Sequence, residues 1–252
     1  MKLLVVGAGE MGRWVADTVE ADVAFCDADS SVAADAAAAR QARRVPPATD
    51  ESFDVVCLAV PMSTIPEAVE TYAPCATEAI FDVSGVMADP LAAMADHARD
   101  LERGSFHPLF APPRVPGNVA VVTANDGPQL TAVREAMREA GNTVFETTVD
   151  EHDQAMETVQ ASAHTAVLAY AIAAESVRDE FSTPVSAQLE EIAATVTEGN
   201  AGVYAEIQST FDGADAVAEA AERIADADDE TFVDLYEQAK ANVEANSRER
   251  HQ

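Results

Sequence analysis

The chain has 252 residues, 48% of them hydrophobic, and its formal net charge of −30 arises from 45 acidic and 15 basic residues. This length is enough for one large domain or two modest ones, and the composition permits a buried core. So negative a field excludes binding to nucleic acid and to acidic membrane surfaces. The acidic residues are spread along the chain and lysine is confined to Lys2 and Lys240, which is typical of proteins from a high-salt cytoplasm.

No run of about 18 apolar residues is present, so we expect no membrane-spanning helix. The first residues lead directly into a predicted strand and a glycine turn, without the apolar segment and cleavage site of a secretory signal. Cys26 and Cys57 fall in strand-like segments and no C-x-x-C pair is present, so we interpret them as small buried thiols. We therefore expect a cytoplasmic protein.

From residue 2 to about residue 146, short β-rich segments alternate with helical patterns. The predicted strands are Lys2–Val6, Asp22–Cys26, Phe53–Val60, Ala79–Val83, Val119–Thr123 and Thr143–Phe145. The predicted helices between them are Glu10–Glu20, Ser30–Arg44, Ile65–Tyr72, Pro90–Arg99 and Gln129–Ala140. Such alternation predicts an α/β fold with a doubly wound parallel sheet of the Rossmann type.

After Asp150 the β signal disappears. The predicted helices are Glu151–Phe181, Pro184–Thr197, Val203–Phe211, Ala214–Ala227 and Glu230–Ala245. The first of them is apolar on more than one side, and a helix of that kind must be buried. Because the helical part offers limited cover, we expect a homodimer formed through the C-terminal helices. We predict two domains, a dinucleotide-binding domain over residues 1–148 and a helical substrate and dimerisation domain over residues 149–252.

A glycine-rich motif, G-x-G-x-x-G, directly follows the first predicted strand and opens the first predicted helix. Gly7 permits the tight turn, Gly9 lets a dinucleotide pyrophosphate approach the backbone, and Gly12 lets the helix pack on the strand. The helix N-terminus presents free N–H groups to the phosphates. The predicted cofactor-binding residues are Gly7, Ala8, Gly9, Glu10, Met11, Gly12, Asp27 at the end of the second strand, and Ala59, Val60 and Pro61 at the end of Phe53–Val60.

Asp27 determines which dinucleotide we expect. It lies about 20 residues after Gly7, where a carboxylate hydrogen-bonds the ribose hydroxyls and repels a 2′-phosphate. Asp29 adds to the repulsion, and no arginine is adjacent in the sequence. This pattern favours NAD over NADP. The alternative is a structural glycine turn with a solvated Asp27.

Three further segments carry polar groups: Asp82–Met87, Ser105–Pro112, and Glu151–Asp153 followed by Gln160 and His164. We predict that His107 lies in a proline-rich loop after a short strand. An enzyme that takes a hydride from an alcohol carbon needs an acceptor for the hydroxyl proton, and neutral histidine is the commonest choice. The alternatives are a solvated loop histidine at His107, a helix-start element at His152 and a core histidine at His164. No compact cluster of ligands predicts a metal site.

Taken in this order, the segments resemble the prephenate dehydrogenase family. That family has G-x-G-x-M-G at its N-terminus, then an A-V-P strand end, a D-V-x-S-V-K loop, an H-P-M-F-G-P loop, and a helix with H-D and a later histidine. The counterparts here are Gly7–Gly12, Ala59–Pro61, Asp82–Met87, His107–Pro112, and His152-Asp153 with His164. Segments 182–184 and 200–208 also look like the archaeal branch of the family.

The resemblance implies NAD-dependent oxidative decarboxylation of prephenate to 4-hydroxyphenylpyruvate, a tyrosine precursor. It implies that neutral His107 accepts the hydrogen bond of the ring hydroxyl, that Ser84 holds this hydroxyl or the cofactor amide, and that His164 lines the substrate pocket. His152, Gln160 and Arg114 are the residues that we expect to bind substrate.

This chain departs from the family pattern at three positions. The family serine aligns better with Gly85 than with Ser84, the lysine of that loop is Met87, and the arginine that binds a substrate carboxylate falls near Thr195. Arg114 and Arg178 are candidate replacements for that arginine.

Other functions stay open at this point. Arogenate is an alternative substrate, and a non-catalytic NAD-binding regulator is an alternative of another class. A β-hydroxyacid dehydrogenase would need a catalytic lysine on a helix of the second domain, where neither Lys2 nor Lys240 is placed. A pyrroline-carboxylate-type reductase would not explain the dipeptide His107-Pro108.

Overall fold

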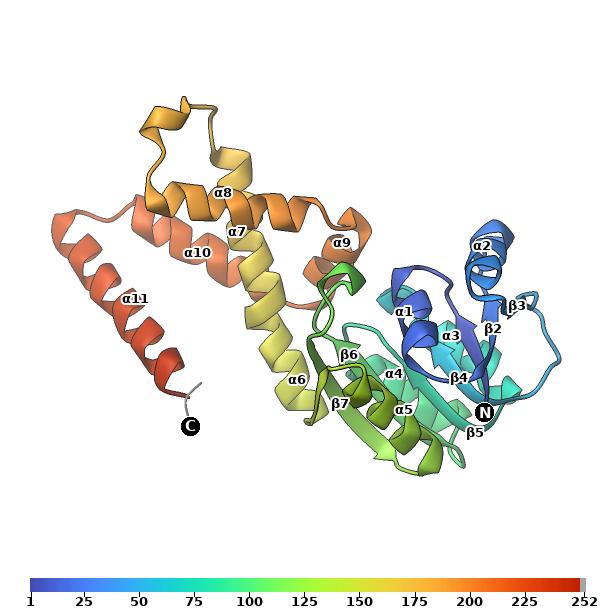
Figure 1. Ribbon diagram of the computed structural model, residues 1–252. Coiled ribbons are helices and arrows are strands. Elements are labelled where there is room, and N and C mark those ends of the chain that lie inside the picture. Colours follow the sequence, from blue (N-terminus) through green and yellow to red (C-terminus); the bar gives the residue numbers. More distant parts are fainter. Residues whose placement is uncertain (250–252) are drawn as a thin grey trace. The chain divides into compact units, whose positions relative to one another are not determined.

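The computed structural model describes residues 1–249, and their contacts divide the chain into two compact units (Figure 1). The first unit comprises Met1–Met156 together with Ala205–Thr210, and the second comprises Glu157–Tyr204 and the chain from Phe211 onward. The first unit therefore receives a short segment from far along the chain. Among the described residues, no helix is long and apolar enough to cross a membrane.

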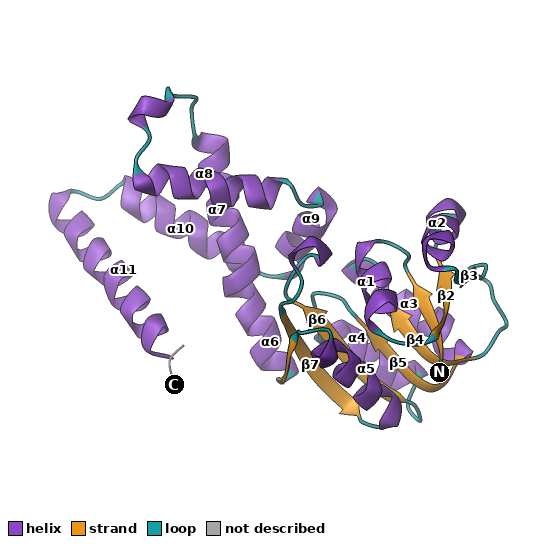
Figure 2. Cartoon of the chain, in the orientation of Figure 1, coloured by secondary structure: helices purple, strands orange, loops and turns teal. Residues whose placement is uncertain are grey.

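The first unit is built around a single eight-stranded sheet (Figure 2). Its strands are β1 (Lys2–Val6), β2 (Asp22–Cys26), β3 (Arg43–Arg44), β4 (Phe53–Leu58), β5 (Ala76–Asp82), β6 (Glu102–Pro108), β7 (Asn118–Asn125) and β8 (Thr143–Glu146). They lie in the order β3-β2-β1-β4-β5-β6-β7-β8. Strands β1 to β6 are parallel to one another, which confirms the predicted doubly wound sheet, whereas β7 pairs antiparallel to β6 and parallel to β8.

Helices cover both faces of this sheet. They are α1 (Glu10–Thr18), α2 (Ser30–Arg40), α3 (Ile65–Tyr72), α4 (Ala88–His97), α5 (Pro128–Glu139) and α6 (Val149–Met156). Alternate residues of β1 point to opposite faces. Leu3 and Val5 pack in a core with residues of α1, α2 and α5, and Leu4 and Val6 pack in a second core with residues of α3 and α4.

Two local predictions in this unit are wrong. The second helix ends at Arg40 instead of Arg44, because Gln41 adopts a left-handed conformation (φ 56°) and the chain then turns into β3. His107 lies in β6 and not in a loop, and its register partner on β7 is Ala120. The prediction of buried thiols is confirmed, since Cys26 and Cys57 are fully buried and free.

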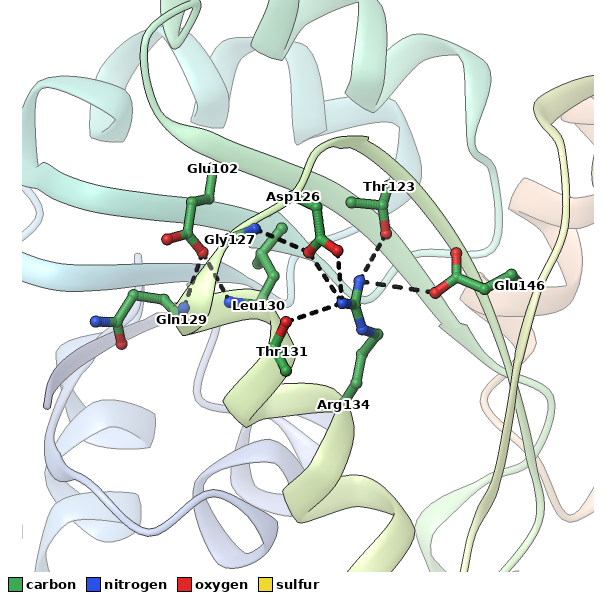
Figure 3. Close-up of polar contacts among 9 residues, drawn as sticks. All are labelled: Glu102, Thr123, Asp126, Gly127, Gln129, Leu130, Thr131, Arg134 and Glu146. Carbon is green, nitrogen blue, oxygen red and sulfur yellow. Dashed lines mark hydrogen bonds and ion pairs between the residues drawn. The ribbon is translucent and has the colours of Figure 1, made fainter.

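Polar contacts join the start of β6 to the helix α5 (Figure 3). The Glu102 carboxylate accepts hydrogen bonds from the backbone N–H groups of Gln129 and Leu130, both at 2.9 Å, and so caps the N-terminus of α5. The buried Arg134 guanidinium donates to both carboxylate oxygens of Asp126 at 2.9 Å. The Glu102 contacts join the first residue of β6 to α5, and the Arg134 contacts join α5 to the residue that follows β7.

The second unit is helical. Its elements are a π-helical turn (Glu157–Ser162), α7 (Ala163–Ala173), a short turn (Asp179–Phe181), α8 (Pro184–Thr197), α10 (Gly213–Ala225) and α11 (Asp229–Glu249). Helix α9 (Ala201–Thr210) begins in this unit and ends in the first. No residue of α7 is buried within the chain.

The predicted single helix Glu151–Phe181 is not continuous. It is divided into α6, the π-helical turn and α7, and it ends at Ala173. The reason is a contact with the start of α10, where Ser162 Oγ lies 2.8 Å from the Glu157 carbonyl and 3.0 Å from the Gly213 carbonyl. Gly213 approaches so closely that a Cβ there would collide with the Glu157 carbonyl. The widened turn therefore makes room for α10.

Candidate functional site

The glycine motif forms the turn between β1 and α1. Gly7 has a φ of +92°, and a Cβ at this position would collide with the Ala59 carbonyl. A Cβ at Gly12 would collide with the Gly7 carbonyl, whereas one at Gly9 would meet nothing within 4 Å. Gly9 is the N-cap of α1, and no side chain caps the first N–H groups of the helix. The turn Gly7–Gly12, which we call the cofactor cradle, fits a dinucleotide pyrophosphate.

Asp27 lies at the end of β2 and faces the glycine turn. Its carboxylate accepts hydrogen bonds from the N–H groups of Ala8 at 2.8 Å and Asp29 at 2.9 Å. A carboxylate has about four lone-pair sites, so these two bonds leave capacity for ribose hydroxyls. The structure also shows an arginine that the sequence did not place here, because Arg44 Nη1 donates to the Ser30 carbonyl at 3.4 Å.

Arg13 holds the glycine turn from the other side. Its Nε donates to the Ala8 carbonyl at 2.8 Å, and a second nitrogen donates to the Val32 carbonyl at 3.4 Å. Both bonds are to the protein backbone, so in this structure Arg13 serves to fix the turn.

The side chains of Asp153, His152 and His107 form a hydrogen-bonded series that ends at His107. His107 Nδ1 lies 2.9 Å from His152 Nε2, and His152 Nδ1 lies 2.7 Å from a carboxylate oxygen of Asp153. The same carboxylate accepts the N–H groups of Met87 at 3.1 Å and Ala88 at 3.3 Å. His107 and His152 are both buried, with exposed fractions of 6% and 3%. β6 supplies the first histidine and α6 supplies the other two residues.

The hydrogen-bonded series Asp153–His152–His107 relates the tautomers of its two histidines. With a neutral His152 that donates from Nδ1 to the Asp153 carboxylate, His152 Nε2 is an acceptor. In that arrangement His107 donates from Nδ1, and its Nε2 is the hydrogen-bond acceptor. The Nε2 atom lies 3.6 Å from the position that a Cβ of Gly85 would occupy. The acceptor end therefore faces the loop after β5.

Burial keeps His107 neutral. Desolvation of the ring and the neighbouring His152 lower the pKa of His107 to about 3, and the Asp153 charge acts in the opposite direction. Burial acts to raise the pKa of Asp153, but the hydrogen bonds from His152 and the Met87 amide lower it below its usual value. The site thus holds a carboxylate and a neutral imidazole, as an acceptor for a hydroxyl proton requires.

The predicted residue Ser84 lies at the end of β5 beside a buried carboxylate. Its N–H and Oγ are 2.9 Å and 2.5 Å from Asp82 Oδ2, and its Oγ is 3.1 Å from the Val86 carbonyl. Burial raises the pKa of Asp82 to about 6, against the hydrogen bonds from Ser84. The hydroxyl of Ser84 is therefore directed to protein atoms here, and its contact with substrate stays a prediction.

The other predicted site residues are divided between the two units. Arg114 is exposed in a short turn (Pro112–Arg114) of the first unit. His164 and Gln160 belong to the second unit. The His164 ring packs edge-on against the Tyr204 ring, with 4.7 Å between the ring centres. Burial lowers the pKa of His164. In residues 1–249, no three His, Cys, Asp or Glu side chains are grouped in a way that could hold a metal ion.

The sequence did not reveal the hydrogen bond between His107 of β6 and His152 of α6. The dipeptide His152-Asp153 was recognised, but we expected His152 to bind substrate. Both of its ring nitrogens have protein partners in the structure, which supports a position behind His107. The adjacent carboxylate was the available signal, because an acid next to a histidine often fixes its tautomer.

Comparison with known proteins gives a relative in sequence and several in fold. The chain is 31% identical over 267 residues to 4-amino-4-deoxyprephenate dehydrogenase of Streptomyces pristinaespiralis, covering 93% of this chain and 88% of that protein. No protein-family model matches the chain.

Two solved structures are similar over nearly their whole length. One is prephenate dehydrogenase from A. aeolicus in complex with hydroxyphenyl propionate and NAD+, with a TM-score of 0.71, 15% identity, and coverage of 100% of this chain and 97% of that one. The other is Synechocystis arogenate dehydrogenase, with a TM-score of 0.60, 15% identity, and coverage of 98% and 100%. At such identities these similarities show a common fold.

Proposed function

The chain belongs to the prephenate dehydrogenase family, and on that premise we propose that it catalyses NAD-dependent oxidative decarboxylation of prephenate to 4-hydroxyphenylpyruvate. The observation that carries this proposal is the chain Asp153–His152–His107, which presents a neutral acceptor nitrogen in a protein with a dinucleotide cradle. A hydride-transfer enzyme needs both parts.

In the proposed mechanism, His107 Nε2 accepts a hydrogen bond from the ring hydroxyl of the substrate. A hydride leaves the carbon that bears this hydroxyl, the ring carboxylate leaves as carbon dioxide, and the electron pair of the broken C–C bond completes the aromatic ring. As positive charge develops on the hydroxyl oxygen, the neutral imidazole stabilises its proton. His152 and the Asp153 carboxylate keep His107 in the accepting tautomer. When bound, NAD supplies the acceptor for the hydride.

The cradle residues bind the cofactor in this proposal. Backbone N–H groups at the start of α1 hold the pyrophosphate, Gly9 leaves room for it, and Asp27 holds the adenosine ribose. Ala59, Val60 and Pro61 border the nicotinamide. Arg114 binds a substrate carboxylate, with His164, Gln160 and Ser84 as further substrate contacts. Arg114 follows His107 on a segment whose Phe110 ring rests edge-on against Trp14, 5.3 Å between ring centres.

A second candidate substrate is 4-amino-4-deoxyprephenate, which is the substrate named for the Streptomyces pristinaespiralis relative. Its ring amine is an N–H donor, and a neutral imidazole accepts an N–H as well as an O–H. Arogenate is the third, since an arogenate dehydrogenase shares the fold. His107 does not discriminate among these three acids, so selection must come from the groups that bind the rest of the substrate.

The proposed function is tested by NADH formation, followed by absorbance near 340 nm in molar potassium chloride. Prephenate, arogenate and 4-amino-4-deoxyprephenate are offered separately with NAD and with NADP. Turnover of prephenate with NAD, and release of one carbon dioxide for each NADH, is the expected result. A folded chain that binds NAD but turns over none of the three acids would instead be a non-catalytic NAD-binding regulator.

We expect Asp27→Ala to weaken NAD binding and to permit use of NADP. The change removes the ribose acceptor and the repulsion of a 2′-phosphate, and it leaves Arg44 near the same loop as a cation for that phosphate. The ratio of kcat/KM for NAD to that for NADP is the measurement. The control is the double variant Asp27→Ala/Arg44→Ala, which should lose NAD affinity without gaining NADP. An unchanged ratio in Asp27→Ala would show that another residue selects the cofactor.

We also propose that the protein is a homodimer formed through the second unit and that it works in a high-salt cytoplasm. Large apolar side chains of this unit are exposed in the single chain: Ile172, Val177, Phe181, Val185, Tyr236 and Val243. A second copy is the partner that covers such a surface in this proposal. Sedimentation in molar potassium chloride should give the mass of a dimer, and a monomer at micromolar concentration would contradict this assembly.

A further inference from the structure

Glu206 on α9 is hydrogen-bonded to the turn that follows Ala59, Val60 and Pro61. One carboxylate oxygen accepts the Met62 N–H at 3.1 Å. The other accepts the Ser63 hydroxyl at 2.7 Å and the Ser63 N–H at 3.4 Å. All of these residues belong to the first unit. The contact joins positions 144 residues apart, so it is a tertiary contact and not a local turn.

These bonds satisfy donors that the turn itself leaves open. Met62–Thr64 forms a single 3-10 turn before α3, and its N-cap residue Pro61 makes no side-chain cap. The first N–H groups of a helical turn have no acceptor within it, and a carboxylate there is favourable. Glu206 therefore acts as a cap that is supplied from a distant part of the chain.

The capped turn also contacts the surroundings of His107. The Met62 side chain is buried, and its sulfur lies 3.0 Å from the position that a Cβ of Gly85 would occupy. His107 Nε2 lies 3.6 Å from the same position. Met62 and the acceptor nitrogen therefore flank Gly85 together. On the strand side, the Ala59 carbonyl lies directly against Gly7 of the cofactor cradle.

We propose that Glu206 is a positioning residue for the reaction. By fixing the backbone of Met62 and Ser63, it keeps the Met62 side chain against Gly85 and so maintains the wall beside His107 Nε2. The proposal rests on the proposed function, because the position of Met62 matters to the reaction only if His107 accepts the hydrogen bond of the substrate. A purely structural staple would change stability and leave the kinetic constants of the folded enzyme unaltered.

The chemistry of the contact requires a carboxylate. Three donors converge on two oxygens, and each oxygen of a carboxylate only accepts. A glutamine keeps the shape but offers a single acceptor oxygen, and its NH2 group would face an N–H donor. Glu206→Gln therefore removes part of the cap with little change in volume.

The test compares Glu206→Gln, Ser63→Ala and the double variant in the full-length protein. Glu190→Gln, an exposed residue of α8, is the matched control. We expect Glu206→Gln to lower kcat about 10- to 100-fold, as displacements near 1 Å in an active site do. KM for NAD should change less than kcat. Ser63→Ala should have a smaller effect in the same direction, and the double variant should resemble Glu206→Gln alone, because the two residues act through one contact.

Hydrogen exchange of the Met62 and Ser63 amides gives a second readout that needs no cofactor or substrate. Both amides should exchange faster in Glu206→Gln than in the wild type and the control. Faster exchange with an unchanged kcat would overturn the positioning role and leave a structural staple. Unchanged exchange, or strictly additive effects of the two substitutions on kcat, would overturn the contact itself. An inactive wild-type enzyme would refute the proposed function and this role with it, while the exchange rates would still report whether the contact exists.

Discussion

His107→Asn should lower kcat by about 10²- to 10⁴-fold, which is the usual contribution of a positioned proton acceptor. The shorter amide keeps a polar group on β6 but cannot place an acceptor where His107 Nε2 now lies beside Gly85. NAD affinity should stay close to that of the wild type, because the cradle lies on a different loop. The measurements are steady-state kinetics with prephenate and an equilibrium titration with NAD.

The control for this substitution is His97→Asn, since His97 is exposed on α4. It should behave as the wild type in both measurements. A His107→Asn enzyme whose kcat stays within about threefold of the wild type would remove His107 from the mechanism. A loss of NAD affinity in the same variant would indicate that the substitution disturbs the sheet and not the reaction alone.

Asp153→Asn should lower kcat about 10- to 1,000-fold, with a smaller change in KM. The corresponding change in a Ser-His-Asp triad lowers kcat about 10⁴-fold, because the histidine takes the wrong tautomer. A smaller effect is expected here because the step is hydride loss, in which the histidine only stabilises a proton. The Asp153 carboxylate serves three donors, His152 and the amides of Met87 and Ala88, and an asparagine has one acceptor oxygen for them.

If the NH2 group of the new asparagine faces His152, the proton positions along the chain reverse. His152 would then donate from Nε2, His107 would accept at Nδ1, and its Nε2 would carry the hydrogen. The variant Asp150→Asn, on the exposed side of the same helix, is the control and should retain full activity. Equal kcat values in Asp153→Asn and the wild type would show that the tautomer of His107 is fixed by other contacts.

The sequence predicted those features whose causes are local. Each glycine of the motif has a steric reason that a short window contains, and the structure shows the collisions that a Cβ would cause at Gly7 and Gly12. Strands β1, β2 and β4 are apolar runs between turn residues, so they too were predicted. The sheet followed from their alternation with helices.

The extent of strand β6 was missed: the short strand was expected to end before His107, whereas β6 continues to Pro108. It contains Gly104 and begins with charged residues, and its extended form comes from pairing with β5 on one side and β7 on the other. Its register places His107 under the cover of α6, where burial lowers the pKa of the ring. No local pattern contains that information.

The sequence also did not reveal the polar contacts of the site, because they join residues that are far apart along the chain. His107 and His152 are 45 residues apart, and Glu206 and Met62 are 144 residues apart, so spacing cannot show that they meet. The break in the predicted helix Glu151–Phe181 has the same origin. It depends on the approach of Gly213, which a periodic pattern does not reveal.

The return of Ala205–Thr210 to the first unit restricts how this protein could have been assembled during evolution. A gene fragment ending at Met156 would encode every strand of the sheet and the whole glycine turn, but not the carboxylate that caps the turn at Met62. Given the positioning role that we propose for Glu206, recombination with an unrelated helical partner would transfer the cofactor cradle without the geometry around His107. The two halves of the gene are expected to be inherited together, and the nucleotide-binding half is not an exchangeable cassette.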